Sequence, residues 1–104
     1  MINNFWKAGK KVKHFIIVKF NETVDVEAII NPIKELFNKA LAIKGISSIT
    51  IYKSNSDLSN RHDLMIEMIL TKAALIEFDN SYIHKEWKEA YGDLILNKTI
   101  FDCD

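Results

Sequence analysis

The order in which apolar periodicities follow one another constrains the fold of this chain most strongly. Residues Val12–Phe20 alternate with a period of two and are rich in β-branched and aromatic side chains, which is typical of a β-strand. Residues Val26–Ile43 carry apolar side chains at spacings of three and four, which predicts an amphipathic helix. The same two periods recur further along, and they predict strands at Ile46–Lys53, Asp63–Leu70 and Leu94–Cys103 and a second helical region, broken near Asp79–Ser81, at Lys72–Tyr91.

This order of elements predicts an α+β fold, the ferredoxin-like βαββαβ plait, in which an antiparallel four-stranded sheet carries helices on one face. Pro32 disfavours helical geometry at Asn31, so we expect either a kink or a short turn followed by a main helix from Pro32. Gly45 is expected to end that region. The apolar stripe of the first helix should comprise Ile29, Ile33, Leu36, Phe37, Ala40 and Leu41.

A chain of 104 residues fits one domain. Residues 1–11 are poor core material and are expected to form an N-terminal extension, whose Phe5 and Trp6 would pack on the domain edge or on a partner subunit. Residues 12–104 would form the domain. Both faces of its strands carry apolar side chains, with Phe15, Ile17, Met65 and Ile69 opposite Ile16 and Ile66. Because helices cover only one sheet face, we predict a homodimer with sheets packed face to face.

Composition excludes several classes of protein. Lys and Arg together number 14, as do Asp and Glu, and a formal charge of zero argues against a dedicated nucleic-acid binder. The single cysteine, Cys103, cannot form an intramolecular disulfide. No apolar run approaches the roughly 20 residues of a membrane span, and no signal-peptide pattern is present, so the cytoplasm is the expected location. No cofactor or metal is expected, because the chain has three glycines and no phosphate-loop, dinucleotide or metal-ligand motif.

The three histidines are the candidates for chemistry. His84 lies three residues before Trp87 in the second helical region, where it could act as a general base or be a partly exposed helix residue without a task. His14 lies on an otherwise apolar face of the first strand, which is more typical of a core histidine with a hydrogen-bond partner than of a catalyst. His62-Asp63 is a weak metal signal, because adjacent strand residues point to opposite faces.

Several short motifs, taken in order, resemble the stress-responsive A/B barrel domain (Dabb) family, a branch of the dimeric α+β barrels. The resemblance covers about residues 12 to 103. It begins with Val12-Lys13-His14 followed by Phe-Ile-Ile-Val-Lys-Phe, and it continues through Ile43-Lys44-Gly45-Ile46, His62-Asp63-Leu64, Ile66-Glu67 and Ile100-Phe101-Asp102. It implies a small homodimer whose paired sheets form a barrel, with a cavity in each subunit between helices and sheet.

The resemblance also implies site residues. The family's His-Pro-x-His motif corresponds to Ser81–His84, in which only the second histidine, His84, is kept. In a plant polyketide cyclase of this family that histidine acts as a base with a nearby tyrosine, and here Phe78 stands at the tyrosine position. His14 matches a pocket residue of the opening motif. Cavity-lining positions would be Ile16, Ile66 and Met68, with Trp87 as a wall.

Three hypotheses follow. The leading one is a small homodimeric α+β barrel protein that binds a small apolar or aromatic molecule between its helices and its sheet. The alternative is a lyase, cyclase or isomerase that uses His84 as general base on a carbonyl compound, with His14 assisting through hydrogen bonds. A third is a non-catalytic interaction module. The binding hypothesis requires a cavity of at least a few hundred Å³.

Overall fold

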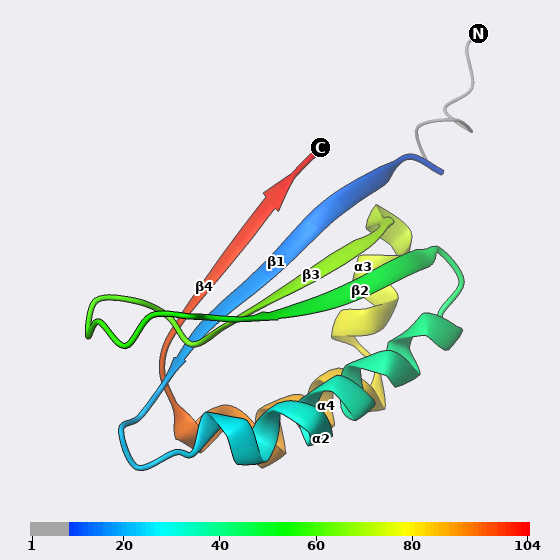
Figure 1. The fold of residues 1–104 in the computed structure, drawn as a ribbon. Helices are drawn as coiled ribbons and strands as arrows, with labels where there is room; N and C mark the ends of the chain where they lie inside the picture. The colour runs from blue at the N-terminus through cyan, green and yellow to red at the C-terminus, as the bar shows by residue number, and fades with distance from the viewer. Residues whose placement is uncertain (1–8) are drawn as a thin grey trace, which may run out of the picture.

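A computed structural model of the chain describes residues 9–104, so residues 1–8, including Phe5 and Trp6, lie outside the described residues. A four-stranded sheet carries all three α-helices on one face (Figure 1). The strands are β1 Lys11–Phe20, β2 Ile46–Lys53, β3 Leu64–Thr71 and β4 Ile95–Cys103. The helices are α2 Val26–Asn38, α3 Lys72–Asp79 and α4 Tyr82–Tyr91, with short 3-10 helices η1 Lys39–Ala42 and η2 Gly92–Leu94. The predicted ferredoxin-like α+β fold is confirmed.

The sheet has the order β2-β3-β1-β4, and every neighbouring pair is antiparallel. β1 alternates strictly, with Val12, His14, Ile16, Val18 and Phe20 buried toward the helices. β3 repeats this pattern in register, because Ile16 lies opposite Ile66 and His14 lies opposite Met68. Side chains directly opposite each other in antiparallel strands share a face. The register therefore fixes which residues point to the helices.

The helices begin at short polar side chains that accept hydrogen bonds from backbone N–H groups. Asp25 caps α2, Thr71 caps α3 and Ser81 caps α4. The predicted break between α3 and α4 is confirmed. α2 runs continuously through Pro32, so the predicted short turn before a separate helix does not form. The continuous helix buries Ile30, Ile33, Leu36 and Phe37 against the sheet, which offsets the one backbone hydrogen bond that Pro32 cannot donate.

The core lies between the sheet and the helices and is centred on three aromatic rings. The ring of Trp87 meets that of Phe37 edge-on, with the centroids 5.1 Å apart. Phe78 lies against the other side of this cluster, 5.9 Å from Phe37 between centroids. All three side chains are fully buried. Aromatic side chains contribute the largest buried areas of any residue type, so this cluster is a major source of stability.

The opposite face, which we call the open sheet face, carries no helix of the described chain. Its apolar side chains are Phe15, Ile17, Met65, Ile69 and Phe101, and all retain partial or full exposure. The edge strand β4 is also uncovered on its helix-facing side, where Ile100 is 46% exposed. Within residues 9–104 no helix is long and apolar enough to cross a membrane.

Candidate functional site

The register of β1 and β4 places His14 and Asp102 directly opposite each other on the helix-facing side. The His14 Nδ1 atom lies 2.6 Å from the Asp102 Oδ1 atom, a distance typical of a charge-assisted hydrogen bond. His14 is only 7% exposed, whereas the Asp102 side chain is 53% exposed. An Nδ1–H that donates to the carboxylate leaves Nε2 as the acceptor of a neutral ring. The pair therefore connects a buried imidazole to the surface through a carboxylate.

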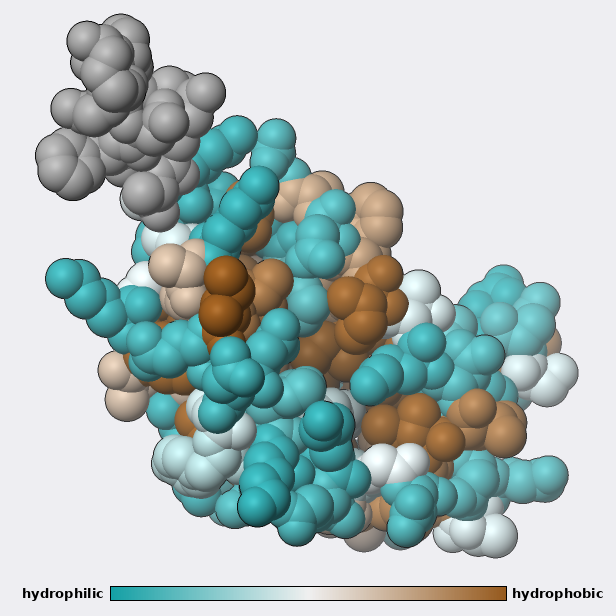
Figure 2. All heavy atoms as spheres, turned by 180° about the vertical axis from the view of Figure 1, so that it is seen from behind, coloured by the Kyte–Doolittle hydropathy of each residue, from teal (hydrophilic) through white to brown (hydrophobic). Residues whose placement is uncertain are grey.

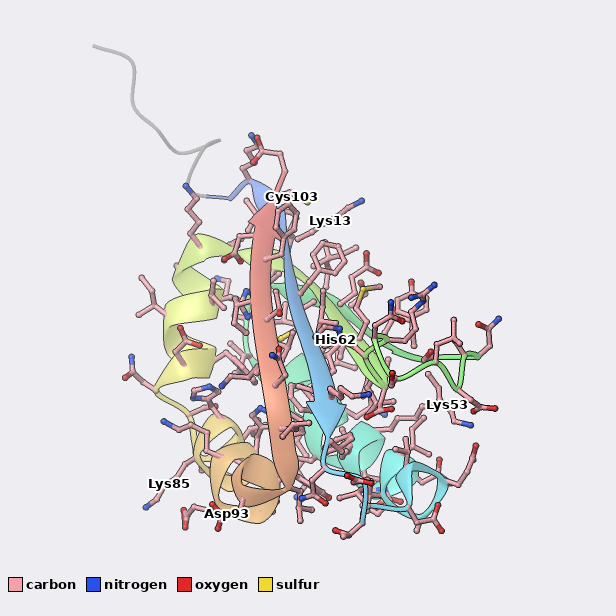
Figure 3. All side chains as sticks on the ribbon, turned by 90° about the vertical axis from the view of Figure 1, so that its left-hand side faces the viewer. Lys13, Lys53, His62, Lys85, Asp93 and Cys103 are labelled. Carbon is pink, nitrogen blue, oxygen red and sulfur yellow. The ribbon has the colours of Figure 1, made fainter. Side chains whose placement is uncertain are left out.

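Asp102 also lines a groove of about 450 Å³ between α3 and the ends of β1 and β4. Its apolar wall comes from Val12 on β1 and from Leu75 and Ile76 on α3. Its polar rim comes from charged side chains, and the complete lining is Val12, Lys72, Leu75, Ile76, Asp102, Cys103 and Asp104. The edge-on view of Figure 3 shows α3 and α4 on one side of β4, with β1 beside it.

The side of the molecule behind the view of Figure 1 carries brown apolar surface set among hydrophilic side chains (Figure 2). Ligand sites in proteins usually combine such an apolar wall with a few fixed polar groups. The groove has this composition, because Asp102 is fixed by His14 and Asp104 is paired with Lys10 at 3.3 Å. It can therefore hold a ring or short chain against α3 while its rim hydrogen-bonds a polar end.

His84 lies in the first turn of α4, where the Ser81 Oγ atom accepts a hydrogen bond from its backbone N–H. Its Nδ1 atom lies 3.1 Å from the carbonyl oxygen of Asp79. A carbonyl only accepts, so Nδ1 carries the proton and Nε2 carries the lone pair of the neutral ring. The ring also packs edge-on against Phe78, with the centroids 5.4 Å apart. Backbone geometry thus selects the tautomer that has a basic Nε2.

Burial lowers the pKa of His84 below its ordinary value. The positive charges of Lys88 and Lys98 act in the same direction, whereas Asp79 opposes them. Lys98 belongs to the helix-facing side of β4, since it pairs with Val18. The ring is therefore predominantly neutral near pH 7, which is the form that can accept a proton.

This shift predicts how stability depends on pH. A histidine whose pKa is lower in the folded than in the unfolded chain favours unfolding when it is protonated. Its contribution is present above the unfolded value of about 6.5 and is lost as the pH falls below it. We expect wild-type protein to lose more unfolding free energy than His84→Gln between pH 7.5 and pH 5.5, measured by urea unfolding at both pH values. Equal losses in the two proteins would contradict this assignment.

The other residues predicted for the ligand site lie in the core. These are Ile16, Ile66, Met68, Phe78 and Trp87, none more than 3% exposed. They pack between sheet and helices and are not among the groove residues. Within residues 9–104 no hydrogen bond joins His14 to His84. Their roles in binding and catalysis stay predictions.

Sequence reasoning did not select Asp102 as a site residue. It belongs to the closing motif Ile100-Phe101-Asp102, but no neighbouring residue in the sequence marks it as part of a site. The signal that could have found it is strand register, because an antiparallel β1–β4 pair brings a carboxylate on β4 opposite His14. His62 is partly exposed at the end of the β2–β3 loop, and its Nε2 atom lies 3.4 Å from the Asn97 Oδ1 atom. In the described part of the chain, no group of three or more His, Cys, Asp and Glu side chains could hold a metal ion.

Comparison with known proteins shows which solved structures share the fold of this chain. No protein-family model matches the sequence, and no curated protein matches it with statistical significance. Solved structures do match it. A dimeric ferredoxin-like protein of unknown function from Thermobifida fusca superposes with a TM-score of 0.76 at 12% identity, over 98% of this chain and 97% of that one. A Dabb family protein with a ferredoxin-like fold from Mesorhizobium loti gives a TM-score of 0.70 at 10% identity, over 90% and 95% of the two chains.

The chain has the fold of a Dabb protein. The fold implied by the motif resemblance is thus confirmed, whereas identities this low carry no activity across. The same fold also supports catalysis in another protein. The hydroxynitrile lyase from Passiflora edulis matches with a TM-score of 0.71 at 11% identity, over 90% of this chain and 92% of that one.

Proposed function

We propose that this protein is a homodimeric α+β barrel protein that binds a small, largely apolar or aromatic molecule in the groove between α3 and the β1–β4 strands. The observation that carries the proposal is Asp102, which lines the groove while its carboxylate holds His14 at 2.6 Å. A ligand seated against Leu75 and Ile76 would place a polar substituent within reach of this pair. The groove volume of about 450 Å³ suits a molecule of one or two rings.

The homodimer is supported by two observations. Structural neighbours from Thermobifida fusca and Bacteroides fragilis are described as dimeric. The open sheet face presents Phe15, Ile17 and Phe101 without any covering element in the described chain. Exposed apolar surface of this kind marks an interaction site, and two-fold packing of identical faces buries it in both copies.

The test is a thermal-shift screen against small aromatic acids and β-keto acids, with matched surface variants. A ligand at about 100 times its dissociation constant adds roughly 2.7 kcal/mol to the stability of the protein that binds it. Ile76 is 64% exposed in the groove, and Leu58 is 60% exposed outside it, so both can be replaced by Asp with little effect on the core. We expect a hit to stabilise the wild-type protein and Leu58→Asp but not Ile76→Asp.

A hit that stabilises Ile76→Asp equally would show that the ligand binds elsewhere. If no compound stabilises any of the proteins, the groove is not a site for these compounds and the interaction-module hypothesis gains weight. Asp102→Asn, which removes the charge that holds His14, should weaken any ligand whose polar end contacts the pair.

Catalysis is the second candidate function, and the tautomer of His84 favours it. Its Nδ1–H is held by the Asp79 carbonyl, so the basic Nε2 could remove a proton next to a carbonyl group and promote an aldol-type cyclisation or isomerisation. His14 would assist through a hydrogen bond. A compound that reaches His84, which is not among the groove residues, should then be converted by the wild-type protein, and His84→Ala should lose about 100-fold or more of the rate. Conversion at an unchanged rate would exclude His84 as the base.

A further inference from the structure

The open sheet face carries one negative and one positive charge in its three central cross-strand rows. The first row is Ser48, Ile69, Lys13 and Cys103; the second is Thr50, Glu67, Phe15 and Phe101; the third is Tyr52, Met65, Ile17 and Thr99. Every other side chain in these rows is apolar or small and uncharged, except for the neutral phenol of Tyr52. Glu67 and Lys13 are therefore the groups whose burial would cost most if this face were covered.

Glu67 is fixed in position within the chain. The Tyr52 hydroxyl donates a hydrogen bond of 3.2 Å to its Oε1 atom. The carboxylate raises the pKa of the Tyr52 phenol, so the phenol stays protonated and remains the donor. A carboxylate has about four acceptor sites, and this contact occupies one. Within residues 9–104 no ion pair involves Glu67, so its second oxygen is available to a cation from outside the chain.

Lys13 presents the complementary charge. It is exposed and projects from β1 on the side of the sheet away from α3 (Figure 3). Lys13 lies opposite Ile69, whereas Glu67 lies opposite Phe15, so the two charges are diagonal neighbours in adjacent rows. Among the described residues Lys13 forms no ion pair, including none with Glu67. One chain thus holds both halves of a charge pair on one face without joining them.

We propose that in the homodimer Glu67 of each copy binds Lys13 of the other copy across the open sheet faces. This inference rests on the proposed homodimer and names the contact that sets its register. In a two-fold interface, if residue i contacts residue j then j also contacts i, so the single acid and single base of these three rows give two identical ion pairs. The Tyr52 hydrogen bond holds the carboxylate ready for the incoming ammonium group. Unpaired burial of either charge would cost several kcal/mol, which rejects other registers.

The experiment is sedimentation of the full chain over a range of concentrations, with charge reversals. We expect Glu67→Lys and Lys13→Glu each to weaken the dimer by roughly 100-fold or more, because each places like charges together. The double variant Lys13→Glu/Glu67→Lys restores opposite charges and should recover most of the affinity. Lys98→Glu reverses a charge on the other side of the same sheet and should leave the dimer unchanged. Circular dichroism verifies that each variant is folded.

The outcomes separate this inference from the proposal beneath it. A monomeric wild-type protein would overturn the homodimer. A wild-type dimer that neither single variant weakens would show that the open sheet face is not the interface. If the single variants weaken the dimer but the double variant does not recover its affinity, the open sheet face is the interface. The Glu67–Lys13 pairing would then be overturned. Should a single variant fail to fold, Lys13→Gln and Glu67→Gln in high and low salt provide the same comparison.

Discussion

Replacing Trp87 with alanine is expected to lower the free energy of unfolding by about 3–5 kcal/mol, the largest effect of any single substitution considered. Trp87 is fully buried, packs edge-on against Phe37 and lies 5.4 Å from Tyr91 between ring centroids. Its removal leaves a cavity between α4 and α2 that rigid neighbours cannot fill. Because the free energy of unfolding of domains of this size is only about 5–15 kcal/mol, the folded state of this variant should be only marginally stable.

Urea unfolding followed by circular dichroism, at one fixed protein concentration, measures this loss. Tyr82→Ala is the matched control, since Tyr82 is an exposed aromatic residue on the same helix and should change stability by no more than about 0.5 kcal/mol. Trp87→Phe keeps a ring against Phe37 and should fall between the two. If Trp87→Ala cost less than about 1 kcal/mol, the aromatic cluster would not be the centre of the core.

The second large effect is expected at Gly45, where alanine should cost about 2–3 kcal/mol. Gly45 has φ of +99°, a conformation that side chains rarely adopt. A Cβ there would lie 2.7 Å from the Thr71 Oγ1 atom and 2.9 Å from the Ala74 Cβ atom. Neither neighbour can move cheaply, because Thr71 Oγ1 is the N-cap of α3 and accepts a hydrogen bond from the Ala74 backbone N–H. Backbone strain and loss of the cap therefore add together.

Gly92 provides a control, because alanine at this position should raise the stability of the protein instead of lowering it. It caps the end of α4 with φ of −54°, and a Cβ there would meet nothing within 4 Å. Alanine fits this conformation and restricts the unfolded chain, so Gly92→Ala should stabilise the protein by about 0.4–1 kcal/mol. Thermal and urea unfolding of the two variants side by side tests the pair. Equal effects of the two substitutions would mean that the close contact at Gly45 is relieved elsewhere.

Most of the fold could be predicted from the sequence because its periodicities are strong and its breaks are marked. The alternation of Val12–Phe20 and the interruption at Asp79–Ser81 both correspond to observed elements. The prediction was wrong for Leu41, which is exposed although it continued the apolar stripe of α2. The chain changes to a 3-10 helix at Lys39, and the tighter winding rotates Leu41 away from the core. A hydrophobic pattern read with a period of 3.6 residues per turn cannot detect this change from α-helix to 3-10 helix.

Less of the candidate site could be predicted, because it depends on contacts between distant parts of the chain. His14 could be found locally, as a polar residue on an apolar strand face. Its partner Asp102 lies 88 residues further along and becomes apparent only once β4 is paired with β1. The groove likewise forms because the helices leave the edge strand β4 uncovered. The alternation of the strands places Ile16, Ile66 and Met68 on the face of His14, where they lie in the core, and their role in binding stays a prediction.

The order of strands in the sheet also affects how the chain folds during its synthesis. β1, the earliest of these four strands to be made, pairs with β3 and β4 and not with β2. At translation rates of about 5–20 residues per second, the roughly 40 residues between β1 and β3 delay its first partner by roughly 2–8 seconds. Throughout that interval an apolar strand has only α2 to cover it. β4 then has to pair with the second edge of β1, so this domain is most prone to aggregation before β4 has been made.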